Sequence, residues 1–496
     1  LIFLGNRPRS RYHYQGKPPV TAVLAVSVHI TQPSRIENLL IKYRFKEKDF
    51  HFSNRDKEQE KNVFTVIVGK NGTGKSRLMK SVIESLIGKS NRNGVLRGQQ
   101  TFEGLLPENK IYNIELDKEP QKIIAVSTSP FDKFPLDIYG HLDKKYTYLG
   151  LRDLRSRDLG MAYMANIYIS LLKSVVNESG RTNKICKVLG FLGYSPRIEA
   201  RYHLEFSRRR IQDALVSSNP VEYFIENFIS NEHHPSHRNR TRGFLDEERN
   251  VDVSKVERFL DIYRKIDPSN LKPKLEVFLE GSGLLFPHNV IYDANDLFFL
   301  AEIGVAKLRE ITLEKNNGKS FRIGDASSGE QSVVMSILGI ASQICDDSLI
   351  CIDEPEVCLH PEWQEKYIDI LINTFKSFRG CHFLIATHSP LMVSKLNDRN
   401  CYLMKMENGE VTNASQVNNR SVDFQLVNTF GTPGFKNEYL TRELISVLSS
   451  FGQTGKLDDI TKEKLKFLLS LKDQISELDP VLKLMDMAQE ALLESL

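Results

Sequence analysis

The sequence predicts an α/β fold with parallel strands at its centre, and three apolar runs carry this prediction. The runs at residues 63–68, 349–352 and 381–386 are short and almost free of charge. Such runs are typical of strands that are buried on both faces of a parallel sheet. A helical pattern follows the first run, so strands and helices alternate; its apolar face carries Leu78, Met79, Val82, Ile83 and Leu86.

The stretch between the first strand and this helix reads Gly69-Lys70-Asn71-Gly72-Thr73-Gly74-Lys75-Ser76, which matches G-x-x-x-x-G-K-[ST] in full. Glycines let backbone N–H groups curve around phosphate oxygens, and the following helix N-terminus adds a favourable field. Lys75 would neutralise the β- and γ-phosphates of ATP, and Ser76 would offer its hydroxyl to Mg²⁺. An ordinary glycine-rich turn is the alternative, which the complete pattern disfavours. The predicted ATP-binding residues here are Gly69, Asn71, Gly72, Thr73, Gly74, Lys75, Ser76 and Arg77.

The second run ends in Asp353-Glu354-Pro355-Glu356. Carboxylates at the end of a buried strand are costly unless a cation uses them. We predict that Asp353 holds the Mg²⁺ shell and that Glu354 orients and polarises the water that attacks the γ-phosphate. A strand end with an acidic turn is the alternative.

The third run delivers Thr387-His388-Ser389-Pro390. His388 could sense the γ-phosphate through a hydrogen bond. A lone histidine at a strand end is more often structural, but the two neighbouring motifs favour the functional role.

The order of four motifs along the chain resembles that of the ABC-type ATPases of the RecF, SMC and OLD group. These motifs are the phosphate loop, Ser327-Ser328-Gly329-Glu330-Gln331, the acidic strand end and the His388 segment. The resemblance implies an ABC-ATPase-like core (a P-loop NTPase) in which Ser328, Gly329 and Glu330 bind the nucleotide of a partner copy. It also implies that residues 356–360 lie near the dimer seam. ATP would then be sandwiched between two protomers of a dimer or higher oligomer.

Residues 123–134, 148–152 and 424–435 resemble, more narrowly, the AAA-like ATPases of anti-phage defence, in particular the PtuA family of Septu and Septu-type retron systems. That resemblance implies a partner nuclease of the HNH class (PtuB-like) and leaves retron or phage nucleic acid open as a further partner. One departure stands out: Ser127 and Thr128 occupy the place where the group carries a metal-contacting glutamine. A hydroxyl could substitute for it; otherwise hydrolysis would be slow or regulated.

Four segments follow from these motifs. Residues 1–142 are the N-terminal half of the core, with strands at 20–30 and 36–45; residues 143–285 are a mostly helical insertion, with helices at 161–176 and 221–229. Residues 286–415 are the C-terminal half, which finishes with a strand at 401–406 and a turn at Asn408-Gly409. Residues 416–496 form a C-terminal helical region. Its helical patterns lie at 437–449, 461–471 and 481–493.

Composition limits the class of protein. The 496 residues are 41% apolar and carry a net charge of +4, which neither demands nor excludes nucleic acid. No stretch of about 18 uncharged apolar residues predicts a membrane span. The N-terminal segment with Arg7, Arg9 and Arg11 lacks the apolar core of a secretory signal. Six cysteines show no zinc spacing and suit reduced thiols, so we expect a cytoplasmic protein.

The densest basic features lie in the predicted insertion, at Arg208-Arg209-Arg210 and at residues 233–242. They could follow a phosphate backbone, but exposed helix faces and loops are the more ordinary interpretation. The histidines His233, His234 and His237 lack a partner set that would complete a zinc site.

The C-terminal helices either form a satellite bundle or dock a partner, and the PtuA resemblance favours docking. OLD-type proteins carry a Toprim nuclease at this place, but its acidic motif is absent, so no nuclease is predicted in this chain. Three functions therefore compete: an ATPase that controls a separate nuclease, a RecF-like DNA-repair ATPase that binds DNA directly, and a nucleotide-gated scaffold with little turnover.

Overall fold

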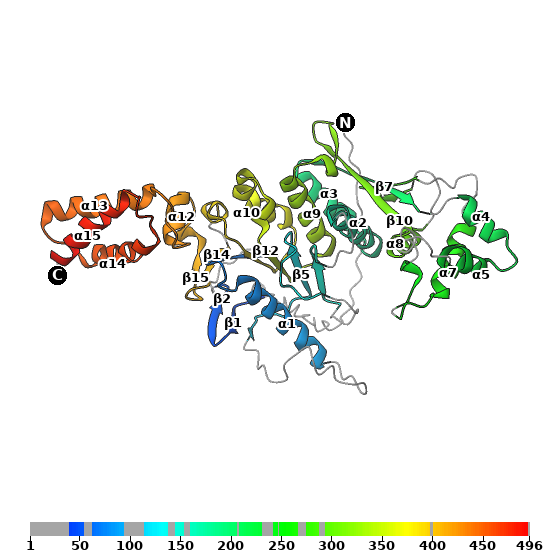
Figure 1. Ribbon diagram of the computed structural model, residues 1–496, viewed down its shortest axis with the longest axis horizontal. Helices are drawn as coiled ribbons and strands as arrows, with labels where there is room; N and C mark the ends of the chain where they lie inside the picture. The colour runs from blue at the N-terminus through cyan, green and yellow to red at the C-terminus, as the bar shows by residue number, and fades with distance from the viewer. Residues whose placement is uncertain are drawn as a thin grey trace, which may run out of the picture. The chain divides into compact units, whose positions relative to one another are not determined.

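Seven strands form the central sheet of the computed structural model, in the order β15-β14-β3-β13-β12-β5-β6 (Figure 1). Strands β14 to β6 in this order run parallel, and β15 pairs antiparallel with β14. The predicted α/β class and parallel sheet are thus confirmed. The strands are β3 (Asn62–Val68), β5 (Lys122–Ser127), β6 (Tyr146–Leu149), β12 (Ser348–Asp353), β13 (Cys381–Ala386), β14 (Cys401–Lys405) and β15 (Val411–Asn413).

The model describes residues 39–53, 62–93, 114–136, 144–152, 159–205, 208–230, 242–246, 248–265, 274–286, 293–396 and 400–494. The strand predicted at residues 20–30, the segment with Arg7, Arg9 and Arg11, and the histidines at 233–237 lie outside these residues. Among the residues described, no helix has the length and the apolar run that a membrane span requires. All six cysteines are free thiols.

Apolar side chains cover both faces of the central sheet, which is why its strands read as continuous apolar runs. On one face, α1 (Lys75–Asn93) buries the predicted stripe from Leu78 to Leu86 against side chains such as Ile67 and Ala125. On the other face, α2 (Leu159–Asn177), α9 (Ser328–Gln343) and α10 (Pro361–Phe375) share one core with Val66 and Ile352.

Two antiparallel sheets accompany the central one. The smaller consists of β1 (Lys42–Phe45), β2 (Lys48–His51) and β4 (Ile114–Glu115). Of the strand predicted at 36–45, the described residues contain β1. The larger sheet has the order β11-β10-β7-β8-β9; its strands are β7 (Tyr194–Leu204), β8 (Lys274–Glu280), β9 (Gly283–Leu285), β10 (Ala306–Lys315) and β11 (Ser320–Arg322).

The segment 143–285 contains the predicted helices, but it also contains strands, so the prediction of a mostly helical insertion was incomplete. Helices α2 and α5 (Pro220–Phe224), with the π-helical turn at Ile225–Ser230, confirm the patterns at 161–176 and 221–229. The same segment also supplies β6, β7, β8 and β9, which were not predicted. Because β10 joins β7 in the larger sheet, this sheet crosses the predicted boundary at 285/286. The other helices here are α3 (Arg181–Phe191), α4 (Arg208–Val216), α7 (Val253–Arg264) and, just beyond the segment, α8 (Ala294–Glu302).

The C-terminal region is helical, as predicted. The short helix α11 (Pro390–Ser394) precedes it and lies against α12 (Val422–Asn428), the first α-helix of the region. Helices α13 (Glu438–Thr454), α14 (Asp459–Leu469) and α15 (Val481–Glu494) confirm the three patterns and enclose a core of their own around Leu444, Leu465 and Met485. Asn437 and Asp458 begin α13 and α14 as N-caps, since each side chain accepts a backbone N–H.

Candidate active site

The phosphate loop, residues 69–76, connects β3 to α1 and has the local geometry that its sequence predicts. Gly72 and Gly74 adopt φ angles of 80° and 100°, which side chains other than glycine rarely tolerate. At Gly69 a Cβ atom would lie 2.9 Å from the Cβ of Met406, so the close packing also requires glycine. Asn71 in the loop and Arg77 in the first turn of α1 are both exposed. The loop is therefore shaped by its glycines.

Sheet register brings the three predicted motifs to one edge. Strands β3, β13 and β12 are neighbours, and Asp353 pairs with Ala386, which pairs with Ile67. The ladder continues past the strand ends, because Glu354 N donates to Ala386 O at 3.0 Å and Thr387 N donates to Ile67 O at 3.1 Å. The His388 segment therefore lies beside the phosphate loop, and the acidic strand end lies next to the His388 segment on the same side of β3.

Lys75 and His388 are in direct contact. The Nζ of Lys75 lies 2.5 Å from Nε2 of His388 and 3.0 Å from the carbonyl oxygen of Gly69. Burial and the neighbouring Lys75 charge lower the pKa of His388 to about 4, so the imidazole is neutral at pH 7 and its Nε2 accepts a hydrogen bond from the Lys75 ammonium. Burial also lowers the pKa of Lys75, which is 5% exposed, while the carboxylates of Glu354, Glu356 and Asp353 oppose this shift.

Ser76 and Asp353 form the second contact of the site. The hydroxyl of Ser76 donates to Oδ1 of Asp353 at 3.1 Å. The Asp353 side chain is 3% exposed, and burial raises its pKa to about 7 in spite of this hydrogen bond. Since its pKa is raised on folding, Asp353 stabilises the fold at low pH, and this contribution falls as the pH rises from about 4 to 7.

A hydroxyl and a buried carboxylate that ionises at a cost are a suitable donor pair for a hard divalent cation. Magnesium takes oxygen ligands and keeps several waters or phosphate oxygens. Within the described ranges, no cluster of three or more His, Cys, Asp or Glu residues is arranged to hold a metal. The residues therefore fit a Mg²⁺ ion that shares its coordination with a phosphate and water, held by Ser76 and Asp353.

Glu354 and Glu356 have different surroundings. Glu354 has a φ of 48°, unusual for a residue with a side chain, and its Oε1 lies 3.8 Å from Nε2 of His388. Its carboxylate is about one third exposed, as a group that contacts an attacking water requires. Glu356 is half-buried and accepts the backbone N–H of His388, so it holds the His388 segment in place. The sequence indicated no such role for Glu356.

Residues 327–331, the signature segment, lie at the start of α9. Ser327 caps the helix by accepting Glu330 N at 3.2 Å, and Ser328 is exposed. At Gly329 a Cβ atom would lie 2.8 Å from the carbonyl oxygen of Cys358, so this glycine packs against the turn that follows Glu354. Glu330 accepts Tyr194 Oη at 2.9 Å and Lys315 Nζ at 3.1 Å, which engages its carboxylate within the chain.

The place of the expected glutamine follows β5. Ser127 pairs with Asp353 in the sheet and its hydroxyl accepts Ser129 N at 3.1 Å. The buried Oγ1 of Thr128 has no protein hydrogen-bond partner, and both residues line a small cavity beside Asp353. The Thr128 hydroxyl is therefore the group in this position that is available to a ligand.

The comparisons with known proteins agree with this geometry. Residues 183–394, which include the signature segment, the acidic strand end and His388, match the family model described as "AAA domain, putative AbiEii toxin, Type IV TA system". The matched region is less than half of the chain, and the phosphate loop lies outside it.

Two curated proteins with similar segments are named as retron ATPases. The "Retron Ec83 probable ATPase" of Escherichia coli is 30% identical over 107 residues, 19% of this chain and 19% of that protein. The "Retron Vc95 probable ATPase" of Vibrio cholerae serotype O1 biovar El Tor is 30% identical over 112 residues, 19% of this chain and 21% of that protein. The alignments span about a fifth of the length of these relatives.

Solved structures resemble the chain distantly. An ATP-binding cassette of an ABC transporter in its ADP conformation is 13% identical, with a TM-score of 0.25, over 79% of this chain and 94% of that one. The Smc head domain with an extended coiled coil, derived from Pyrococcus furiosus, is 14% identical, with a TM-score of 0.27, over 77% of this chain and 96% of that one. The fold assignment rests on the strand order of the central sheet.

Proposed function

We propose that the protein binds and hydrolyses Mg-ATP at the edge of the sheet where β3, β12 and β13 end. The observation that carries this proposal is the convergence of Lys75, Ser76, Asp353, Glu354 and His388 around one loop that is shaped to bind phosphate. Lys75 neutralises the phosphates, and Ser76 and Asp353 hold the cation. When bound, Mg²⁺ neutralises charge on the β- and γ-phosphate oxygens.

Glu354 acts as the group that orients the attacking water. Its strained backbone aims a partly exposed carboxylate past His388, beside the loop. Neutral His388 is hydrogen-bonded to Lys75 in this structure. When Lys75 moves to bind the nucleotide, the imidazole of His388 becomes free to donate a hydrogen bond to the γ-phosphate. The released imidazole reports the presence of the third phosphate.

The nucleotide is capped by a second copy of the chain. Ser328 is exposed at the N-terminus of α9, where backbone N–H groups and the helix dipole favour an anion. Gly329 packs the signature segment against the turn after Glu354, so this segment and that turn belong to the same face. A two-fold dimer would place Ser328 and Gly329 over the partner's phosphates, as the ABC resemblance implies.

The first prediction concerns Asp353. We expect Asp353→Asn to fold normally, because the change removes a buried charge, but to lose at least about tenfold in ATP affinity when Mg²⁺ is present. The loss is measured by isothermal titration calorimetry, in which ATP is titrated into the protein once in the presence of Mg²⁺ and once in the presence of a chelator. The Mg²⁺-dependent gain in wild-type affinity should shrink as the pH falls below 7, since protons compete for the Asp353 carboxylate.

Asp261→Asn, at an exposed ion pair on α7, is the control and should behave as the wild type. If the Asp353→Asn protein keeps the full Mg²⁺-dependent gain in ATP affinity, Asp353 does not hold the cation.

We further propose that the nucleotide state controls a nuclease partner of the HNH class in anti-phage defence. The retron ATPase relatives and the PtuA resemblance support this assignment, and the C-terminal helices provide a surface. Several apolar side chains are exposed there although the bundle has its own core. They are Ile445, Ile460, Phe467, Leu478 and Met487.

We expect a tagged chain to co-purify with an HNH protein encoded beside it, and Ile460→Asp to reduce the recovered nuclease at least about fivefold, since a charge would enter an apolar contact. Recovery is measured by quantitative mass spectrometry. Lys462→Asp, a change at a polar position of the same helix, is the comparison. Steady DNA-stimulated hydrolysis without any protein partner would favour the RecF-like alternative.

A scaffold with little turnover is the second candidate, and Thr128 favours it. A buried hydroxyl in place of the glutamine reaches less far toward the cation. In this scaffold function, ATP closes the dimer and stays bound without being hydrolysed.

A further inference from the structure

A cavity of about 620 Å³ lies between α2 and the C-terminal end of α9, beside the edge strand β6. It is separate from the phosphate loop, since none of residues 69–76 lines it. The nucleotide motifs leave its residues without a role. The polar side chains in its wall are Lys122, Thr147, Tyr148, Tyr163, Asn166, Ser170, Lys173, Ser174, Asn177, Glu178, Arg181, Ser342 and Gln343.

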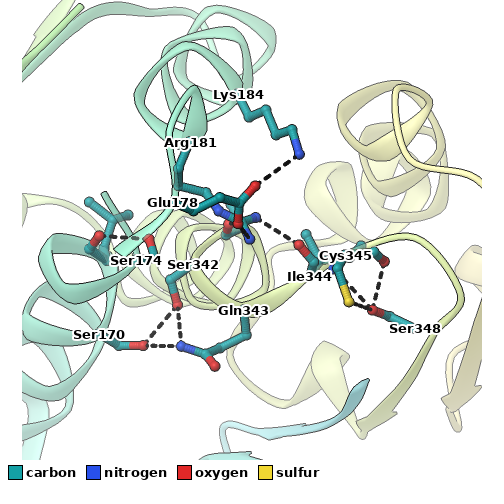
Figure 2. A network of polar contacts seen from close by, with 12 residues as sticks. Ser170, Ser174, Glu178, Arg181, Lys184, Ser342, Gln343, Ile344, Cys345 and Ser348 are labelled. Atoms are coloured by element: carbon teal, nitrogen blue, oxygen red, sulfur yellow. Dashed lines mark hydrogen bonds and ion pairs between the residues drawn. The ribbon is translucent and has the colours of Figure 1, made fainter. Parts of the chain in front are cut away.

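The wall between α2 and α9 is a connected polar network (Figure 2). Ser170 and Ser342 hydroxyls lie 2.9 Å apart, and the amide nitrogen of Gln343 donates to Ser170 at 2.7 Å. The Thr147 hydroxyl on β6 donates to the other end of the same amide at 3.3 Å. These bonds fix the orientation of Gln343, so the wall is organised in advance of any ligand.

Arg181 ties this network to the end of α9. Its guanidinium donates to the carbonyl oxygens of Ala341 at 3.3 Å and Ile344 at 2.7 Å, and pairs with Glu178. Arg181 is only 4% exposed, and these bonds hold its guanidinium in a fixed position in the cavity wall.

The charges around the cavity select the ligand. Lys122, Lys173 and Arg181 contribute three positive charges, against the single carboxylate of Glu178, which already pairs with Arg181 and Lys184. Neutral amides and hydroxyls supply the remaining polar contacts. The volume lies within the range of sites for small organic ligands.

We propose that this cavity binds a small anionic molecule of nucleotide size, with a phosphate toward the lysines and a hydrogen-bonding ring toward the amides. The site lies at the opposite end of α9 from Ser328, so a bound ligand would contact the helix that carries the signature segment. Binding itself does not depend on the proposed ATP hydrolysis.

The test is titration of the full chain with the four ribonucleoside monophosphates, with Mg²⁺ and one equivalent of a non-hydrolysable ATP analogue per chain present to fill the phosphate loop and leave the cavity free. We expect at least one of them to bind with a dissociation constant below about 1 mM and one site per chain. Lys173→Glu, at an exposed position on the rim, should weaken that binding at least about tenfold. Asn166→Trp, which fills the entrance, should abolish it.

Lys187→Glu makes the same charge change on α3 outside the cavity and should leave binding unchanged. Failure of all four monophosphates to bind, or equal binding by wild type, Lys173→Glu and Asn166→Trp, would overturn the proposal. Because the ATP site is filled throughout and none of these residues belongs to it, neither result bears on the proposed hydrolysis.

Discussion

Replacing Glu354 with glutamine is expected to lower steady-state ATP turnover at least about a hundredfold, because the amide cannot polarise the attacking water. ATP affinity should change little, since Lys75, Ser76 and Asp353 are intact. The uncleaved nucleotide should then hold the two protomers together. Phosphate release measures turnover, and light scattering after gel filtration with Mg-ATP measures the dimer.

Glu84→Gln is the matched control for this change. Glu84 lies on α1 in a surface ion pair with Lys80, so its loss should leave turnover at the wild-type rate. If Glu354→Gln hydrolyses ATP as fast as wild type, Glu354 does not catalyse. If wild type itself shows no turnover above background while ATP still induces the dimer, the scaffold candidate replaces the ATPase.

Mixing two inactive variants is expected to restore activity if the site is shared between protomers. Lys75→Ala removes the phosphate contact from one half of the site, and Ser328→Arg blocks the other half at an exposed position that tolerates the larger side chain. Each variant alone should be nearly inactive. An equal mixture should recover about a quarter of the wild-type rate, since half of the dimers are mixed and each has one complete site.

The control mixture combines Lys75→Ala with Glu354→Gln. Both changes affect the half-site that holds the triphosphate, so a mixed dimer has no complete site and no recovery is expected. Full activity of Ser328→Arg by itself, or of a chain that stays monomeric with Mg-ATP, would contradict the sandwich dimer.

The larger antiparallel sheet was not predicted, although two of its strands carry a local pattern in the sequence. In β7 the buried side chains Ile198, Ala200, Tyr202 and Leu204 alternate with partly exposed ones, and β8 alternates in the same way. Alternation with period two is a strand signal. Charged residues between the apolar ones gave the segment a helix-like composition, and β7 pairs with β10, which lies about a hundred residues further along.

The amino-acid sequence by itself determined the phosphate loop, the buried parallel strands and the three C-terminal helices, since each rests on a pattern within a short segment. Glycine at positive φ, unbroken apolar runs and helical spacing are local properties. The tertiary structure alone decided that Lys75 contacts His388, that Glu356 holds the His388 backbone and that Gly329 packs on Cys358. It also decided the polar cavity at the end of α9. These contacts join residues far apart in the chain, and only strand order and helix packing bring them together.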